Sequence, residues 1–203
     1  AFKGSYHGST HGAMSVSANE VKKIAFRPLL PDVRFLPHND IQALEQITTR
    51  TAGVIIETIQ GDAGVRRPSA AFMQALRARC TEVGALLIFD EIQCGMGRAG
   101  SMFAFEQFGV VPDVLTLGKA LGGGMPIGAL VAAQQHLQLF THAPMLGHIT
   151  TFGGHPMVCA AAAATVEVIS VAVVTVAVAV QVHLCLFEVV LELVALVETQ
   201  VRA

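Results

Sequence analysis

The chain has 203 residues and a formal net charge of −2, with 13 Lys and Arg against 15 Asp and Glu. This length suits about one domain with a sizeable core. The charge balance supplies no strongly basic face, which argues against nucleic acid as a partner. None of the four cysteines forms a C-x-x-C pair. The sequence therefore predicts neither a zinc site nor a disulfide framework, and favours reduced thiols in the cytoplasm.

Three short apolar runs predict buried strands, at residues 52–59, 85–91 and 113–119. Between the first two runs, residues 69–84 have the pattern of an amphipathic helix, with Ser69 as N-cap and Gly84 as the stop. The order strand, helix, strand predicts an α/β fold. It favours a mostly parallel sheet with helices on both faces.

Each predicted strand ends in ionisable residues, which are Glu57, then Asp90 and Glu91, then Lys119. Ligands of open α/β sheets bind outside the carboxyl ends of the strands, so these groups are expected on one rim. A lysine in a partly desolvated pocket has a lowered pKa and acts as an amine nucleophile. A lysine with an aspartate that protonates a ring nitrogen is typical of pyridoxal phosphate enzymes. Structural ion pairs at the sheet edge are the alternative.

Other motifs favour no further site. His7 and His11 form H-x-x-x-H, but no glutamate follows His7, so no metal is predicted. The run "GKALGGG" lacks the order of a P-loop, and "GMGRAG" lacks the spacing of a dinucleotide-binding turn.

Four segments in order resemble the class III (subgroup II) pyridoxal-phosphate aminotransferases, nearest to the acetylornithine and ornithine group. They are "YHGSTHGAMSVS", "VIIETIQGDAGV", the long stretch from "LLIFDEIQCGMGR" to "LGKALGGGMPIGALVA", and "GHITTFGGHPMVCAAAAAT". The resemblance implies the type I fold of pyridoxal-phosphate transferases, with an aspartate aminotransferase-like large domain. Residues 1–165 are then a partial cofactor-binding large domain. An N-terminal arm and a C-terminal small domain are expected to be absent.

The resemblance also implies catalytic roles for matching residues. Lys119 would form the Schiff base with the cofactor and later move a proton. Asp90 would pair with the pyridinium nitrogen, and Gln93 would hydrogen-bond the phenolic oxygen. Tyr6 would stack on the ring.

Further residues would complete the site by the same resemblance. His7 and Gly8 would finish the turn after Tyr6, and Glu57 would hold the hydrogen bonds of the site. Thr151 would bind the phosphate of the neighbouring subunit's cofactor. Asp62 stands where related enzymes usually carry a glutamate gate, one methylene longer, and Thr58 replaces a usual proline.

The function implied is transamination in the cytoplasm, from an amino acid or amine of the ornithine or acetylornithine kind to a 2-oxo acid such as 2-oxoglutarate. The cofactor would be pyridoxal 5′-phosphate, and the working unit a homodimer with shared active sites. Two alternatives stay open. One is an aminomutase of the same fold, which Gln93 disfavours. The other is an inactive fragment that serves as an interaction module.

Residues 166–203 differ in composition from the rest. Val168 to Phe187 is a run of twenty residues without Asp, Glu, Lys or Arg. It meets the length of a membrane span, but its flanks lack a basic cluster. A buried or interface helix, such as the start of a connection to a small domain, is a second interpretation. The low complexity of "VAVVTVAVAV" favours a third, in which the segment does not reflect natural sequence.

Overall fold

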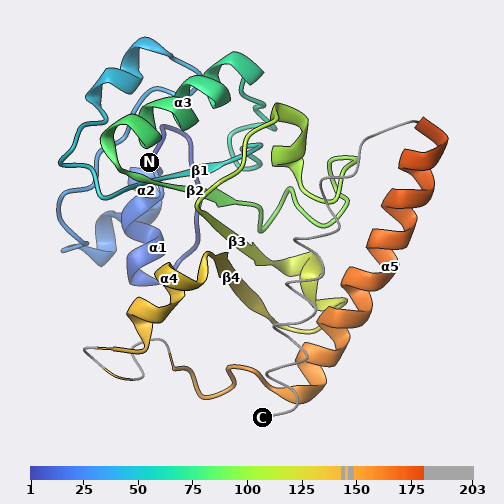
Figure 1. Cartoon of the computed structure of the whole chain (residues 1–203). Helices are drawn as coiled ribbons and strands as arrows, with labels where there is room; N and C mark the ends of the chain where they lie inside the picture. Colours follow the sequence, from blue (N-terminus) through green and yellow to red (C-terminus); the bar gives the residue numbers. More distant parts are fainter. Residues whose placement is uncertain (143–144, 146–148, 181–203) are drawn as a thin grey trace.

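The computed structural model describes residues 1–142, 145 and 149–180, and the side chains up to residue 173. Four strands and five α-helices are described there, with short 3-10 turns between them (Figure 1). The strands are β1 (Gly53–Glu57), β2 (Leu86–Asp90), β3 (Val114–Gly118) and β4 (Gly128–Ala132). The α-helices are α1 (His11–Val16), α2 (Glu20–Lys23), α3 (Ala70–Val83), α4 (Gln134–Leu137) and α5 (Pro156–Val180). The 3-10 turns are η1 (Ile24–Phe26), η2 (Gln42–Gln46), η3 (Ala104–Phe108), η4 (Lys119–Gly122) and η5 (Gln138–Phe140).

The four strands form one sheet in the order β1-β2-β3-β4. β1, β2 and β3 are parallel, and β4 pairs with β3 in the antiparallel direction. Each parallel strand lies inside one of the runs predicted from sequence, so the α/β class and the mostly parallel sheet are confirmed. β4 was not predicted.

The register of the parallel strands aligns their carboxyl ends. Glu57 pairs with Asp90, and Asp90 pairs with Thr116 on the next strand. Lys119 follows Gly118, the last residue of β3. The predicted rim of strand ends is therefore present, and it carries Glu57, Asp90 and Lys119, three of the four ionisable residues expected there.

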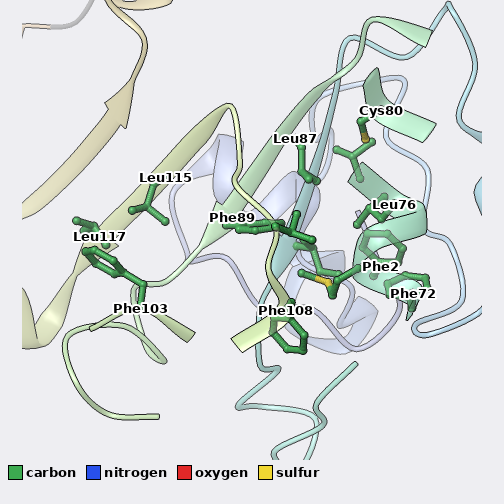
Figure 2. Close-up of a cluster of buried hydrophobic side chains, with 14 of the residues drawn as sticks. Phe2, Phe72, Leu76, Cys80, Leu87, Phe89, Phe103, Phe108, Leu115 and Leu117 are labelled. Atoms are coloured by element: carbon green, nitrogen blue, oxygen red, sulfur yellow. The ribbon is translucent and has the colours of Figure 1, made fainter. Parts of the chain in front are cut away.

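The main core lies on one face of the sheet, between the strands and α3. Because successive strand residues point to opposite faces, every second side chain enters this core. The buried side chains of the strands that belong to this core are Val54, Ile56, Leu87, Phe89, Leu115 and Leu117. Figure 2 shows Leu117 beside Phe103, on the far side of Phe89 from the α3 residues Phe72 and Leu76. On the opposite face, Ile55, Ile88 and Thr116 are half-buried.

α3 begins and ends where the sequence predicted. The Ser69 side chain accepts a hydrogen bond from the backbone N–H of Phe72 at 3.1 Å, and Gly84 ends the helix with a left-handed φ of 74°. Phe72, Leu76 and Cys80 on its inner face are fully buried. The helix is thus fixed at both ends against the sheet.

The N-terminal segment is anchored so that the residues after it reach the strand ends. Phe2 is fully buried and meets the Phe72 ring edge-on, with ring centroids 5.7 Å apart. The backbone N–H of Lys3 donates to the carbonyl of Leu36 at 2.8 Å. These contacts hold residues 5–8 beside the ends of β1 and β2.

Two of the three glycines at the end of η4, Gly122 and Gly123, have a packing reason. A side chain at Gly123 would collide with the Thr165 hydroxyl of α5, and its φ of 56° is left-handed. At Gly122 a Cβ would lie 3.1 Å from Ile127. The approach of α5 therefore requires glycine at position 123, and Ile127 limits the space at position 122, whereas a Cβ at Gly124 would meet nothing within 4 Å.

α5 runs without a break through position 165, where the sequence suggested a boundary, and is described up to Val180. Ala162 and Val166 of this helix are buried against the core. The stretch Pro156–Val173 is long and apolar enough to cross a membrane, which is weak evidence because core helices pass the same test. The remainder of the compositionally different segment 166–203, residues 181–203, lies outside the described residues.

Candidate functional site

A pocket of about 190 Å³ opens at the carboxyl ends of the parallel strands. Seven of the eight residues proposed as cofactor ligands line it, together with two isoleucines; the lining is Tyr6, His7, Gly8, Glu57, Ile59, Asp90, Ile92, Gln93 and Lys119. These residues come from the N-terminal segment and from the ends of all three parallel strands. The structure therefore brings together residues that lie more than 100 positions apart in the sequence.

Lys119 enters this pocket from the turn after β3. Its backbone is left-handed, with a φ of 47°, which is uncommon for a residue other than glycine and often marks a functional position. The side chain is exposed and makes no hydrogen bond or ion pair with the residues that the structure describes. The desolvated surroundings expected from sequence are thus not formed by the described part of the chain, because η4 carries Lys119 to the surface.

Asp90 is buried and held from two sides. Its Oδ2 lies 2.7 Å from Nδ1 of His7, and its Oδ1 accepts a hydrogen bond from the backbone N–H of Ile92 at 3.1 Å. The side chains of His7 and Asp90 are only 2% and 6% exposed. The two contacts fix the orientation of the carboxylate at the wall of the pocket.

The second ring nitrogen of His7 has no partner among the residues that the structure describes. Nε2 is buried and makes no hydrogen bond within the described residues. Most buried polar atoms in proteins are paired, and leaving one unpaired costs about 1–3 kcal/mol. An unpaired nitrogen at a pocket wall is therefore an unusual feature that calls for a functional reason.

Glu57 closes the side of the pocket next to Tyr6. Its Oε1 accepts from the backbone N–H of Tyr6 at 2.8 Å, and its Oε2 accepts from Gly61 at 3.4 Å. Burial raises the pKa of the Glu57 carboxyl, while the hydrogen bond from Tyr6 acts in the opposite direction. Glu57 thus ties the N-terminal segment to β1, and its role in holding the site's hydrogen bonds around a cofactor stays a prediction.

Tyr6 and Gln93 supply a ring and an amide to the lining of the pocket. The hydroxyl of Tyr6 lies 3.1 Å from the hydroxyl of Ser9. The amide of Gln93 lies so close to Gly61 that a Cβ there would sit 2.5 Å from its nitrogen. Glycine at position 61 therefore leaves the space that Gln93 occupies.

Glu91 follows Asp90 directly but faces away from the pocket. It is 1% exposed and accepts from the Thr58 hydroxyl at 2.6 Å and from the N–H groups of Ala104 and Phe105 at 2.9 and 2.8 Å. Burial raises its pKa. The threonine that replaces the usual proline at position 58 is thus the partner of a structural carboxylate.

Asp62 and Thr151 lie outside the lining of this pocket. Asp62 is exposed and forms an ion pair with Lys22 at 2.9 Å, and Lys22 in turn lies 5.2 Å from the centre of the Tyr6 ring. Thr151 is exposed in the turn before α5. Their roles as gate and as phosphate ligand stay predictions.

Sequence reasoning missed Ile59 and Ile92 in the lining. Both follow a strand-end carboxylate by two residues, and both are half-buried. That position relative to Glu57 and Asp90 is the signal that would have found them. They give the pocket apolar walls around its charged groups.

The residues present fit pyridoxal phosphate. The pocket combines an amine, an oriented carboxylate, an aromatic ring and an amide, which are the groups such a cofactor needs around its ring. The volume is below the 300–1,000 Å³ common for pockets that bury whole ligands, so the described residues enclose only part of a cofactor.

Comparison with known proteins agrees with this chemistry. The chain is 46% identical over 162 residues to an acetylornithine aminotransferase of Methanopyrus kandleri, which covers 79% of this chain and 41% of that protein. It is 47% identical over 170 residues to a putrescine aminotransferase of Pectobacterium atrosepticum, covering 80% and 36%. The chain thus spans about two fifths of the length of the curated relatives that it matches.

The fold is also that of solved transaminases. The ornithine aminotransferase of Toxoplasma gondii superposes with a TM-score of 0.77 at 32% identity, over 83% of this chain and 39% of that one. An amine transaminase from an uncultivated Pseudomonas species, solved in its PLP-bound form, gives a TM-score of 0.74 at 29% identity, over 84% and 45%. The family model described as "Aminotransferase class-III" matches residues 1–183. The chain belongs to the class III aminotransferases.

Proposed function

We propose that the protein carrying this chain is a pyridoxal-phosphate-dependent aminotransferase. It moves an amino group from an amino acid or amine to a 2-oxo acid such as 2-oxoglutarate. The observation that carries the proposal is one pocket that joins Lys119, Asp90, Tyr6 and Gln93 at the carboxyl ends of parallel strands. The relatives named for acetylornithine and putrescine support a donor with two nitrogen-bearing ends.

The residues divide the chemical work. When bound, the cofactor supplies an aldehyde that takes up the amino group and a ring that stores electrons. Lys119 would supply the amine that holds the cofactor's aldehyde, and the same amine would move a proton at the substrate's reacting carbon. The Asp90 carboxylate accepts the N–H of the ring nitrogen and keeps it protonated. Tyr6 packs on the ring, and Gln93 donates its amide N–H to the phenolic oxygen.

We also propose a homodimer in the cytoplasm. The described thiols Cys80, Cys94 and Cys159 are buried and free of disulfides, which suits a reducing compartment. Thr151 lies exposed in a turn before α5, where a partner's cofactor phosphate can reach it. Neither nucleic acid nor a membrane is proposed as a partner.

The test uses the complete protein, expressed from its whole reading frame. Pyridoxal phosphate is added and its absorbance followed, and the adduct is then reduced with borohydride and mapped by mass spectrometry. We expect the label on Lys119, and amino transfer from ornithine, acetylornithine or putrescine to 2-oxoglutarate. Lys119→Ala should abolish both signals. Lys3→Ala, at an exposed lysine outside the pocket, is the matched control.

The alternatives give different results. An aminomutase would move the amino group within one molecule and form no glutamate from 2-oxoglutarate. An inactive interaction module would produce no absorbance change and no labelled lysine. A label on any lysine other than Lys119 would contradict the assignment of the nucleophile.

A further inference from the structure

The chain that leaves β1 holds the N-terminal segment at two places. Glu57 accepts the backbone N–H of Tyr6 at 2.8 Å. Three residues later, the side-chain amide of Gln60 donates to the backbone carbonyl of Lys3 at 3.2 Å. The two stretches therefore run in opposite directions, with position 57 opposite position 6 and position 60 opposite position 3. Side chains of the β1 exit make both contacts, so the alignment depends on which residues stand at 57 and 60.

Arg66 completes the contact at Lys3. One nitrogen of its guanidinium donates to the Lys3 carbonyl at 3.0 Å and to Oε1 of Gln60 at 2.6 Å. Gln60 is fully buried, and its backbone exchanges two hydrogen bonds with the backbone of Arg66, at 3.0 and 2.9 Å. Hydrogen bonds from a charged donor are stronger than those between neutral groups. The Lys3 carbonyl is thus held by two side chains that are themselves joined, and we refer to Gln60 and Arg66 as the Lys3 clamp.

Gly4 leaves the space that the guanidinium of the Lys3 clamp occupies. A Cβ at position 4 would lie 2.0 Å from the Arg66 nitrogen that makes both hydrogen bonds. Any side chain at position 4 would therefore have to expel the guanidinium from the Lys3 carbonyl. The end of the Arg66 side chain thus has a defined seat, although the residue as a whole is exposed.

The Lys3 clamp lies next to the pocket without lining it. Tyr6 lines the pocket three residues after Lys3, whereas neither Gln60 nor Arg66 belongs to the lining. The backbone of Tyr6 has its own contact with Glu57, so the clamp adds a second fixed point just before it. A ring that packs on another ring needs a defined offset and tilt, and a segment held at two points keeps both.

We propose that Arg66 is a positioning residue, which together with Gln60 fixes the segment that carries Tyr6 and so keeps the Tyr6 ring against the ring of bound pyridoxal phosphate. The proposal rests on the proposed function, because that function assigns Tyr6 to the cofactor. Arg66 acts only through Tyr6 and contributes no group of its own to the pocket.

The Lys3 clamp is tested first without cofactor, by hydrogen exchange of backbone amides in the complete protein. Arg66→Met keeps a long side chain but removes the donors, and Arg66→Lys keeps a charged donor on a stem one atom shorter. Arg67→Met is the matched control, because the Arg67 guanidinium lies 5.1 Å from the centre of the Phe108 ring instead. We expect the Tyr6 amide to exchange about 3- to 10-fold faster in Arg66→Met, the effect of losing one hydrogen bond. The increase should be smaller in Arg66→Lys and absent in Arg67→Met.

The link to the cofactor is tested by a double-mutant cycle with Tyr6→Leu. The quantity measured is the dissociation rate of pyridoxal phosphate from the complete protein, followed by its absorbance. We expect Arg66→Met to raise this rate about 3- to 10-fold when Tyr6 is present, and to leave it unchanged when Tyr6→Leu has already removed the ring. A contribution of Arg66 to stability alone would raise the rate by the same factor in both backgrounds.

Three results would overturn the proposal. They are wild-type exchange of the Tyr6 amide in Arg66→Met, equal effects of Arg66→Met and Arg67→Met, or equal rate factors with and without the Tyr6 ring. If Arg66→Met does not fold, Arg66→Lys takes its place in both measurements. A wild-type protein that binds no pyridoxal phosphate would refute the proposed function instead. The exchange measurement needs no cofactor, so the two failures are distinguishable.

Discussion

At the scale of single residues, a substitution at Asp90 separates the effect of the side chain's shape from the effect of its negative charge. Asp90→Asn keeps the size of the side chain and one acceptor oxygen but removes the negative charge beside the ring nitrogen. Preorganised charges of this kind contribute several kcal/mol, so turnover should fall at least about 100-fold. Cofactor affinity, measured by equilibrium dialysis, should fall less than turnover. Wild-type turnover in the asparagine variant would show that Asp90 is only a structural carboxylate.

Gly61 tests whether Gln93 must occupy its observed place. Gly61→Ala would put a Cβ 2.5 Å from the amide nitrogen of Gln93, so the amide has to move out of the pocket. We expect weaker binding of pyridoxal phosphate, followed by its absorbance, with little loss of folding stability. Gly12→Ala is the control, since a Cβ there meets only Leu30 at 3.9 Å. Equal cofactor affinity in both variants would contradict a role for Gln93.

Sequence reasoning placed Glu57, Asp90 and Lys119 on one rim because strand ends are local features. Glu57, Asp90 and Lys119 each close an apolar run, and parallel strands place such ends side by side. It could not find the contact of His7 with Asp90, because no local pattern links positions 83 residues apart. The exposure of Lys119 was also missed, since an apolar run does not reveal that its last residue turns outward.

At the scale of elements, Glu91 joins the loop after β2 to η3 and to the end of β1. Burial raises the pKa values of Glu91, Glu57 and Glu106 above the ordinary value. The native state therefore binds more protons than the unfolded chain from about pH 4.5 up to the raised pKa values. The part of the unfolding free energy that comes from these groups thus falls as the pH rises through this window.

The Glu91 contribution is measurable by urea unfolding at several pH values. Glu91→Gln cannot ionise, so its unfolding free energy should depend less on pH above about 4.5 than that of the wild type. Glu82→Gln, at an exposed carboxyl on α3, should keep the wild-type dependence. A Glu91→Gln curve parallel to the wild type would show that Glu91 has an ordinary pKa.

The N-terminus of α3 gives a second test at this scale. Ser69→Ala removes the acceptor of the Phe72 N–H and should lower the unfolding free energy by about 1 kcal/mol. Urea unfolding of this variant against Thr81→Ala, at an exposed position on the same helix, measures the difference. Equal losses in the two variants would argue that the cap adds no stability of its own.

Elements with a strong local pattern were predictable, and those without it were not. The start and stop of α3 followed from Ser69, Gly84 and the spacing of apolar residues. β4 was missed because its pairing depends on the turn that brings Gly128 back beside Gly118. The need for glycine at position 123 was also not predictable, because the contact with α5 joins segments far apart in the sequence.

At the scale of the whole molecule, one arrangement of two subunits would explain both the exposure of Lys119 in the pocket and the exposure of Thr151 in the turn before α5. Lys119 is open to solvent, and Thr151 lies outside the pocket of its own chain. A second subunit that lays its Thr151 loop over this pocket would cover Lys119 and add a hydroxyl for the cofactor phosphate. We therefore predict that the active unit is a homodimer in which each pocket uses one residue from each subunit.

Subunit complementation tests this arrangement. Complete proteins with Lys119→Ala and with Thr151→Ala, each weak alone, are mixed under conditions that exchange subunits. If the loop crosses the interface, each heterodimer has one pocket with both substitutions and one with neither, so it should reach half of the wild-type activity per dimer. If both residues serve the same subunit's pocket, every pocket keeps one substitution and the mixture stays weak. That result, or a complete enzyme active as a monomer, would rule out shared active sites.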